Sequence, residues 1–145
     1  MIIDINKLKY QGKDESEFSF DYQPERVLID LPGAEIDGCI KVEGVVSISG
    51  KSAYVDGKVS YLLKGECSRC LSRAEMVVSE PLEIEFSSLA GAEFVIKAGK
   101  IDLTLPVEEL IITSAPLVIY CKEDCKGVCF GCGANLNESK CTCKN

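Results

Sequence analysis

Cysteine is the residue type in this chain with the clearest capacity for chemistry, because of both its number and its spacing. The sequence holds nine cysteines among 145 residues, and six of them fall in the last 25 residues. A Cys-x2-Cys pair at Cys67 and Cys70 precedes this group. In such a pair both sulfurs can converge on one tetrahedral ion at about 2.3 Å each. The pattern therefore predicts bound metal, and an all-cysteine donor set favours structural zinc.

Eight of the cysteines suffice for two closed tetrahedral sites, so we predict two zinc ions per chain. The first predicted site takes Cys67, Cys70, Cys121 and Cys125, and the second takes Cys129, Cys132, Cys141 and Cys143. A set made only of the first four cysteines after residue 120 also satisfies tetrahedral geometry, so the pairing stays open at this stage. The segment 121–145 is too short to build an apolar core, and metal must supply its folding energy.

Other uses of clustered cysteines fit the sequence less well. A disulfide framework is disfavoured because the cysteine count is odd and the start of the chain lacks the basic and then apolar stretch of an export signal. An iron–sulfur cluster also takes four thiolates, but the ferredoxin spacing is missing. A redox role for Cys67 and Cys70 is disfavoured because the pair follows predicted strands rather than opening a helix. Cys39 is left over, and we expect it to be a small buried or half-buried thiol.

No group of residues predicts an enzyme active site. The sequence has no histidine, which removes the usual general base and the triads that depend on it. Gly50-Lys51-Ser52 lacks the upstream glycine of a phosphate-binding loop and predicts a hairpin turn. Glu83 and Glu85 alternate with apolar residues, as on the solvent face of a strand. We therefore predict a non-enzymatic protein with no catalytic residue.

The charge of the chain argues against binding to bare nucleic acid. The net charge is −7, of which residues 1–120 carry −8 (12 basic and 20 acidic side chains) and residues 121–145 carry +1. Two zinc ions held by eight thiolates would bring the total to −11. A nucleic-acid backbone requires Lys and Arg to displace its counterions, so we expect a basic protein as partner. Arg69 and Arg73, beside the first predicted site, either contact phosphate or balance the thiolate charge.

Membrane contact is not predicted either. No stretch approaches the roughly 18 uninterrupted apolar residues that a membrane helix requires. Cysteines that serve as metal ligands persist in a reducing compartment. We therefore expect a soluble cytoplasmic protein.

The hydrophobic pattern predicts a sheet through the middle of the chain. Apolar and polar residues alternate over three long runs, which is typical of antiparallel strands with one buried face. Strands are predicted at 1–9, 18–22, 40–48, 55–66, 74–86, 94–97 and 117–120. The run 103–112 predicts one short helix, with Pro106 in its first turn and Ala115-Pro116 after its end.

The predicted fold class is mainly β (α+β): an antiparallel meander, split-barrel-like, with one short helix and a C-terminal zinc-binding tail. Residues 1–120 form the predicted β-rich domain. Residues 121–145 form the cysteine-rich tail, which we expect to dock on the tip of the sheet at residues 67–70. The tip is placed there because the first Cys-x2-Cys pair joins two of the long predicted strands.

Three segments of the chain together resemble one known family. Glu66-Cys67-Ser68-Arg69-Cys70-Leu71 resembles the Cys-x-Arg-Cys-Leu signature of the YceD-like family, the large ribosomal RNA subunit accumulation proteins of bacteria and plastids. Residues 101–117 resemble its helical block. Residues 121–143 resemble the cysteine-rich ending of its Gram-positive-type members, although Val128 and Phe130 stand where Leu and Pro are usual. The resemblance is good over residues 60–145 and weak before them.

The resemblance implies a role in the accumulation of large-subunit ribosomal RNA and hence in ribosome assembly, without a known enzymatic activity. It implies a large ribosomal subunit precursor as partner, which fits a basic ribosomal protein as the direct contact. Contact with ribosomal RNA stays open, but not through a basic patch. The alternatives are a zinc-ribbon nucleic-acid-binding or transcription adaptor and a thiol redox or metal-handling protein. Salt-dependent binding to RNA without protein would favour the adaptor.

Overall fold

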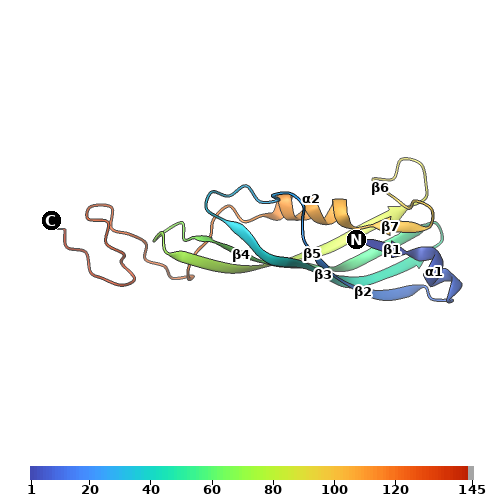
Figure 1. The fold of residues 1–145 in the computed structure, drawn as a ribbon, viewed down its shortest axis with the longest axis horizontal. Helices are drawn as coiled ribbons and strands as arrows, with labels where there is room; N and C mark the ends of the chain where they lie inside the picture. Colours follow the sequence, from blue (N-terminus) through green and yellow to red (C-terminus); the bar gives the residue numbers. More distant parts are fainter. Residues whose placement is uncertain (144–145) are drawn as a thin grey trace.

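The computed structural model describes residues 1–143, and its main feature is one long twisted sheet with a helix across one face (Figure 1). The strand order in this sheet is β2-β3-β4-β5-β6, and a separate two-stranded sheet pairs β1 with β7. In chain order the elements are β1 (Ile2–Asp4), α1 (Ile5–Tyr10), β2 (Glu15–Tyr22), β3 (Glu35–Ser49), β4 (Ser52–Glu66), β5 (Arg73–Ser87), β6 (Phe94–Val95), β7 (Lys100–Asp102) and α2 (Thr104–Ser114).

The three central strands are confirmed, and each is longer than predicted. β3, β4 and β5 have 15 residues each and pair antiparallel through short connections. In each strand the apolar residues of one parity face the core, as the alternation predicts. Val42, Val59 and Leu82 are among the fully buried side chains. Gly44 lies opposite Gly57 in the register. A Cβ atom on Gly44 would lie 2.3 Å from the Asp56 carbonyl oxygen, so these strands approach closely there.

The sheet is open and mixed rather than a split barrel of antiparallel strands. β6 runs parallel to β5, which the sequence pattern did not predict. Among the described residues no pairing joins β2 to β6, so the two edges of the sheet stay apart. The prediction of an antiparallel meander therefore holds for β2 to β5 and is wrong at the β6 edge.

Two predicted strands differ in the structure. Residues 1–9 were expected to be extended, but only Ile2–Asp4 form a strand and Ile5–Tyr10 form a helix. The Asp4 side chain accepts a hydrogen bond from the Lys7 amide at 2.9 Å and so caps that helix. Residues 117–120 form no strand, although Ile119 is buried. The predicted strand at 94–97 is reduced to the two residues of β6.

The helix predicted at 103–112 is confirmed as α2, and it covers one face of the sheet (Figure 1). Val107 and Ile111 are buried against the strands, and the helix ends before Ala115-Pro116 as predicted. The connection between β2 and β3 crosses the same side of the sheet and buries Leu28 and Ile29. The core therefore lies between the sheet and this layer.

Glu108 is a buried carboxylate of α2 that ties the helix to β2 and to the connection after it. Tyr22 donates its hydroxyl proton to Glu108, and Arg26 donates through Nε and Nη2 to Glu108 Oε2 at 2.9 and 2.5 Å. These bonds hold the pKa of Glu108 below its usual value. Burial and the bond to Glu108 raise the pKa of Tyr22 to about 12. Tyr22 and Arg26 therefore keep the Glu108 carboxylate charged on the buried side of α2.

Glu108→Gln is expected to lower the free energy of unfolding by about 1.5 kcal/mol at pH 7. This is the low end of the range for hydrogen bonds to charged groups, because the Arg26 side chain is 58% exposed. Since folding lowers the pKa of Glu108, the contribution is complete above its ordinary pKa of 4.5 and is lost as the pH falls through the lowered value. Denaturant unfolding of both chains between pH 7 and about pH 3 measures the difference.

Glu109→Gln is the matched control, because Glu109 lies in the same helix and is exposed. Its effect is expected to stay within about 0.5 kcal/mol at every pH. A Glu108→Gln deficit that is the same at low and neutral pH would contradict the role given to the carboxylate charge.

Candidate metal centres

Four of the predicted ligands meet where the turn between β4 and β5 contacts the segment after α2. The sulfur atoms of this first cluster all lie within 4.8 Å of one another and belong to Cys67, Cys70, Cys121 and Cys125. The Sγ atoms of Cys67 and Cys125 are 3.7 Å apart, and those of Cys70 and Cys121 are 3.5 Å apart. A tetrahedron with 2.3 Å metal–sulfur bonds has an edge of about 3.8 Å. The first cluster therefore has the dimensions to hold one ion.

Backbone hydrogen bonds also join the segments that carry these cysteines. The Leu71 amide donates to the Cys67 carbonyl at 2.9 Å, which closes the turn. The Ser68 amide donates to the Ile119 carbonyl at 2.8 Å, and the Val128 amide donates to the Arg69 carbonyl at 3.1 Å. The residues before and after Cys121 and Cys125 are thereby fixed against the tip of the sheet.

Arg69 has a structural role at the first cluster. Its Nη1 atom donates to the Cys125 carbonyl at 3.2 Å, and its guanidinium lies over the Tyr120 ring at 4.5 Å from the centroid. Such a stacked and hydrogen-bonded guanidinium stabilises the segment that carries the ligands. Of the two uses that the sequence left open for Arg69, these contacts favour the local one over a free phosphate contact.

The second cluster lies farther along the tail, beyond the end of the sheet (Figure 1). Its sulfur atoms also all lie within 4.8 Å of one another and belong to Cys129, Cys132, Cys141 and Cys143. The Sγ atom of Cys129 is 3.2 Å from that of Cys141 and 3.7 Å from that of Cys143, and the Sγ atoms of Cys132 and Cys141 are 4.0 Å apart. These distances also suit one tetrahedral ion.

Two glycines shape the loop of the second cluster in different ways. Gly133 has φ +71°, the left-handed conformation that glycine adopts without a steric cost. Gly131 does not have a positive φ. Instead, a Cβ atom on Gly131 would lie 2.6 Å from the Cys143 sulfur, so glycine leaves the space that this sulfur occupies.

The first cluster contains the same backbone conformation without a glycine. Leu71 follows Cys70 with φ +61°, just as Gly133 follows Cys132. For a residue with a side chain the left-handed region costs about 1–2 kcal/mol. The Leu71 side chain is 64% exposed, so burial in the core does not offset this cost.

The thiols within each cluster differ widely in acidity. Burial alone would raise the pKa of Cys67, but the backbone amides of Cys121, Cys70 and Arg69 donate to its sulfur and lower the pKa to about 6. Burial and the neighbouring thiols raise the pKa of Cys121 to about 12. In the second cluster, amides of Thr142 and Ala134 lower the pKa of Cys132 to about 6, while the sulfurs around Cys143 raise its pKa to about 12.

This spread follows from the packing of four sulfurs around one point. Once one thiol has ionised, its negative charge opposes ionisation of the next thiol a few ångströms away. A divalent cation at the centre removes that repulsion and permits all four thiolates. Each cluster is therefore an arrangement of donors that a metal ion can complete.

Asparagine side chains link the two clusters, and the sequence analysis gave them no role in the sites. Asn137 Nδ2 lies 3.4 Å from the Cys125 sulfur, and the Lys126 amide donates to Asn137 Oδ1 at 3.0 Å. Asn135 Nδ2 donates to the Ser72 hydroxyl at 3.3 Å. Donors of this kind orient a metal ligand from outside the coordination sphere. In the sequence, the Asn-x-Asn motif between the two cysteine pairs is the signal that could have revealed this role.

The structure brings the eight sulfurs into the two groups assigned from the sequence, rather than into a group made only of tail cysteines. All nine thiols are free. Cys39 belongs to neither cluster and is exposed, so the expectation that it is buried or half-buried is wrong. Cys39 shares the outward parity of Lys41, and the register of β3 shifts between Asp37 and Lys41. The chain thus has two groups of cysteines that can bind metal ions.

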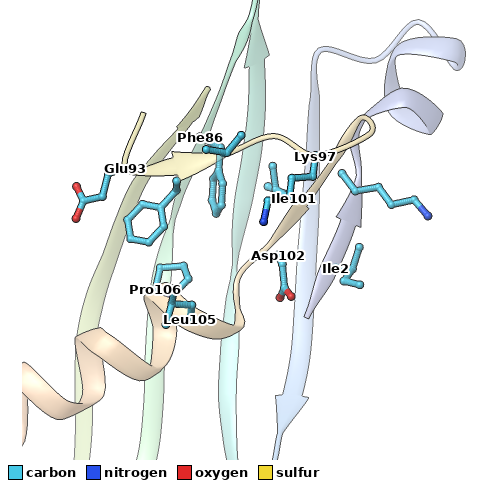
Figure 2. A pocket seen from close by; sticks show the side chains of 11 residues that line it. Ile2, Phe86, Glu93, Lys97, Ile101, Asp102, Leu105 and Pro106 are labelled. Carbon is cyan, nitrogen blue, oxygen red and sulfur yellow. The ribbon is translucent and has the colours of Figure 1, made fainter. Parts of the chain in front are cut away.

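A hollow of about 510 Å³ lies at the opposite end of the sheet from the clusters, between β6, β7 and the start of α2 (Figures 1 and 2). Phe86, Ile101 and Pro106 give it an apolar wall, and Figure 2 shows Glu93 and Asp102 at its sides. No cysteine lines it. The hollow is therefore separate from both candidate metal centres. Among residues 1–143 there is also no helix long and apolar enough to cross a membrane.

The fold and the clusters define a class of protein: a β-sheet domain that carries two tetracysteine groups at one end. The family described as "Large ribosomal RNA subunit accumulation protein YceD" matches residues 55–145, a range that includes most of β4, all of β5 and α2, and all eight clustered cysteines. The chain therefore belongs to the YceD family, as its sequence motifs predicted.

Individual relatives come from bacteria and plants. An uncharacterized protein of Mycobacterium tuberculosis is 28% identical over 128 residues, which cover 79% of this chain and 60% of the relative. The chloroplastic "Large ribosomal RNA subunit accumulation protein YCED homolog 1" of Arabidopsis thaliana is 39% identical over 44 residues, 30% of this chain and 14% of the relative. Its counterpart in Zea mays is 44% identical over 46 residues, 31% of this chain and 16% of that protein.

The alignment therefore spans about 60% of the length of the mycobacterial relative. No solved structure matches the chain.

Proposed function

We propose that this chain is a non-enzymatic zinc-binding factor that promotes the accumulation of large-subunit ribosomal RNA and, through it, ribosome assembly. The observation that carries the proposal is the family match over the whole segment that holds both cysteine clusters. The plant relatives are named for large ribosomal RNA subunit accumulation. The shared segment supports the same role here.

Zinc is the metal that the donor geometry favours. Eight thiolates in two groups of four suit closed tetrahedral zinc sites, and the sulfur–sulfur distances match the edge of a tetrahedron around a single ion. A multi-iron cluster would place several atoms between the thiolates and would need a wider cage. Because four protein ligands leave no open position on the ion, both sites are structural, which supports a non-enzymatic role.

The charge on the sheet supports a basic protein as the direct partner. On the face away from α2, the strand register places Glu17, Asp56 and Glu83 in one row across β2, β4 and β5, with only Val45 of β3 between them. The whole chain carries −7 before metal binding. Such a surface attracts a cationic protein and repels a phosphate backbone. We place the contact at a basic protein of a large ribosomal subunit precursor, in the cytoplasm.

Depletion of the chain is expected to lower mature large-subunit ribosomal RNA relative to small-subunit RNA. Immature particles should accumulate, because a missing assembly factor delays the large subunit alone. RNA quantification and sucrose-gradient profiles of a deletion strain measure both effects, and reintroduction of the wild-type gene is the control. An unchanged RNA ratio and an unchanged profile under several growth conditions would rule out the proposed function.

A further inference from the structure

Two large apolar side chains on the cysteine loops are exposed and lie outside the hydrophobic core. Leu71 follows the first Cys-x2-Cys pair and is 64% exposed. Phe130 lies between Cys129 and Cys132 and has a relative exposure of 105%, so no side chain among residues 1–143 covers it. Large apolar side chains on the surface of a small acidic protein often mark an interaction site when they gather at one place.

The backbone at Leu71 makes this residue costly to keep. Its φ of +61° is the conformation that Gly133 adopts at the same position of the second loop, and Gly127 near the first cluster has φ +75°. Glycine would therefore suit position 71 better than leucine. Neither backbone conformation nor burial therefore favours leucine at this position.

The backbone of the loop that carries Phe130 is held by hydrogen bonds. The Gly133 amide donates to the Cys129 carbonyl at 2.8 Å, and the Cys129 amide donates to the Ala134 carbonyl at 2.8 Å. With an ion bound to Cys129 and Cys132, the loop between them cannot reorganise. An aromatic side chain has only two side-chain torsions, so on a fixed backbone it loses little conformational freedom on binding, which suits an interface anchor.

The two side chains belong to neighbouring loops at one end of the molecule. The Val128 amide donates to the Arg69 carbonyl at 3.1 Å, and Asn135 donates to the Ser72 hydroxyl at 3.3 Å. The loop of Phe130 therefore starts beside the loop of Leu71. The tail projects beyond the sheet, so this end is open to a partner (Figure 1).

We propose that Leu71 and Phe130 are the apolar anchors with which this end of the chain binds a basic protein. The charge decides between protein and RNA as occupant: residues 121–145 carry +1 without metal, but each zinc tetrathiolate contributes −2 directly beneath one of the two loops, so this end is negative once both ions are bound. A cationic protein surface with apolar pockets complements such an end, whereas a phosphate backbone is repelled. The inference rests on the proposed function, because it uses the bound zinc and the basic partner.

The test compares Leu71→Gly and Phe130→Ser with wild type in the full zinc-loaded chain. The probes are the basic protein fraction extracted from purified large ribosomal subunits and protein-free large-subunit ribosomal RNA. Each substitution is expected to weaken binding to the protein fraction about tenfold, as truncation of an interface anchor does. Both variants should keep two zinc ions, and Leu71→Gly should not lower the melting temperature, because glycine relieves the left-handed backbone.

Val77→Ser is the matched control. Val77 is 73% exposed on the outer face of β5, away from the cysteine loops, so its loss should leave binding unchanged. The inference would be overturned if both cysteine-loop variants bound the protein fraction as tightly as the wild type does. Loss of zinc from Leu71→Gly would also overturn it. Binding of the wild type to neither probe, or Phe130-dependent binding to the RNA alone, would also overturn it. The role in ribosomal RNA accumulation is judged separately, by whether depletion changes the ribosomal RNA ratio and the gradient profile.

Discussion

A chain with Cys70→Ser is expected to hold one zinc ion instead of two and to lose the attachment of the tail to the sheet. Cys70 Sγ lies 3.5 Å from Cys121 Sγ, so its removal leaves three thiolates around the first ion. The binding energy of a structural zinc ion is local folding energy, and the first cluster joins the β4–β5 turn to the tail. Elemental analysis of purified protein measures the ion count, and hydrogen exchange at the Val128 amide, which donates to the Arg69 carbonyl, measures the attachment.

Cys132→Ser is expected to give the complementary result. The second ion should be lost, while the first ion and the protection of the Val128 amide remain. Cys39→Ser is the control, because Cys39 is an exposed thiol outside both clusters and its replacement should leave two ions. If Cys70→Ser keeps two zinc ions, Cys70 is not a ligand. If the wild-type chain binds no metal, the prediction of both zinc sites is wrong.

The central strands and α2 could be predicted because their signals are local and periodic. Alternation over 40–48, 55–66 and 74–86 marks one buried face, and it gave the faces of β3, β4 and β5 correctly. The proline residues around α2 marked its start and its end. Such patterns depend on neighbours along the chain, so they are visible without tertiary structure.

The misassigned elements depend on contacts between distant parts of the chain. In the pairing of β1 with β7, Ile3 lies opposite Ile101. The local pattern of residues 1–9 cannot predict this contact. Parallel pairing of β6 with β5 likewise depends on how the loop after Ser87 returns to the sheet. Ile119 resembles a strand residue because it is buried. Its carbonyl, however, accepts a hydrogen bond from the Ser68 amide at the tip of the sheet and not from a neighbouring strand.

The sequence also predicted the grouping of the cysteines more readily than the polar groups around them. Cys67 and Cys70 need two partners, and the first pair of tail cysteines is the next in the chain, which is the grouping seen in the structure. The contact of Asn137 with the Cys125 sulfur spans 12 residues and depends on the course of the tail. The outward position of Cys39 was available from its parity with Lys41, but the base rate for free cysteine suggested burial instead.

The two zinc ions are expected to leave the chain at different rates when a strong chelator is added. Cys67, Cys70 and Cys125 are buried in the first cluster, whereas Cys132, Cys141 and Cys143 are exposed in the second. A chelator can therefore approach the second ion directly, but it reaches the first only after the tail separates from the sheet tip. Opening that contact breaks the hydrogen bond from the Val128 amide in the tail to the Arg69 carbonyl. It also breaks the bond from the Ser68 amide to the Ile119 carbonyl in the segment before the tail.

Zinc release should accordingly show two phases of equal amplitude, with rates that differ at least about tenfold, which corresponds to about 1.4 kcal/mol in the free energy of local opening. A colorimetric chelator assay at constant pH measures both phases. Cys132→Ser should lack the fast phase and Cys70→Ser the slow one, which assigns each phase to its cluster. A single phase in the wild type, or a fast phase that survives in Cys132→Ser, would show that burial does not control the release of the ions.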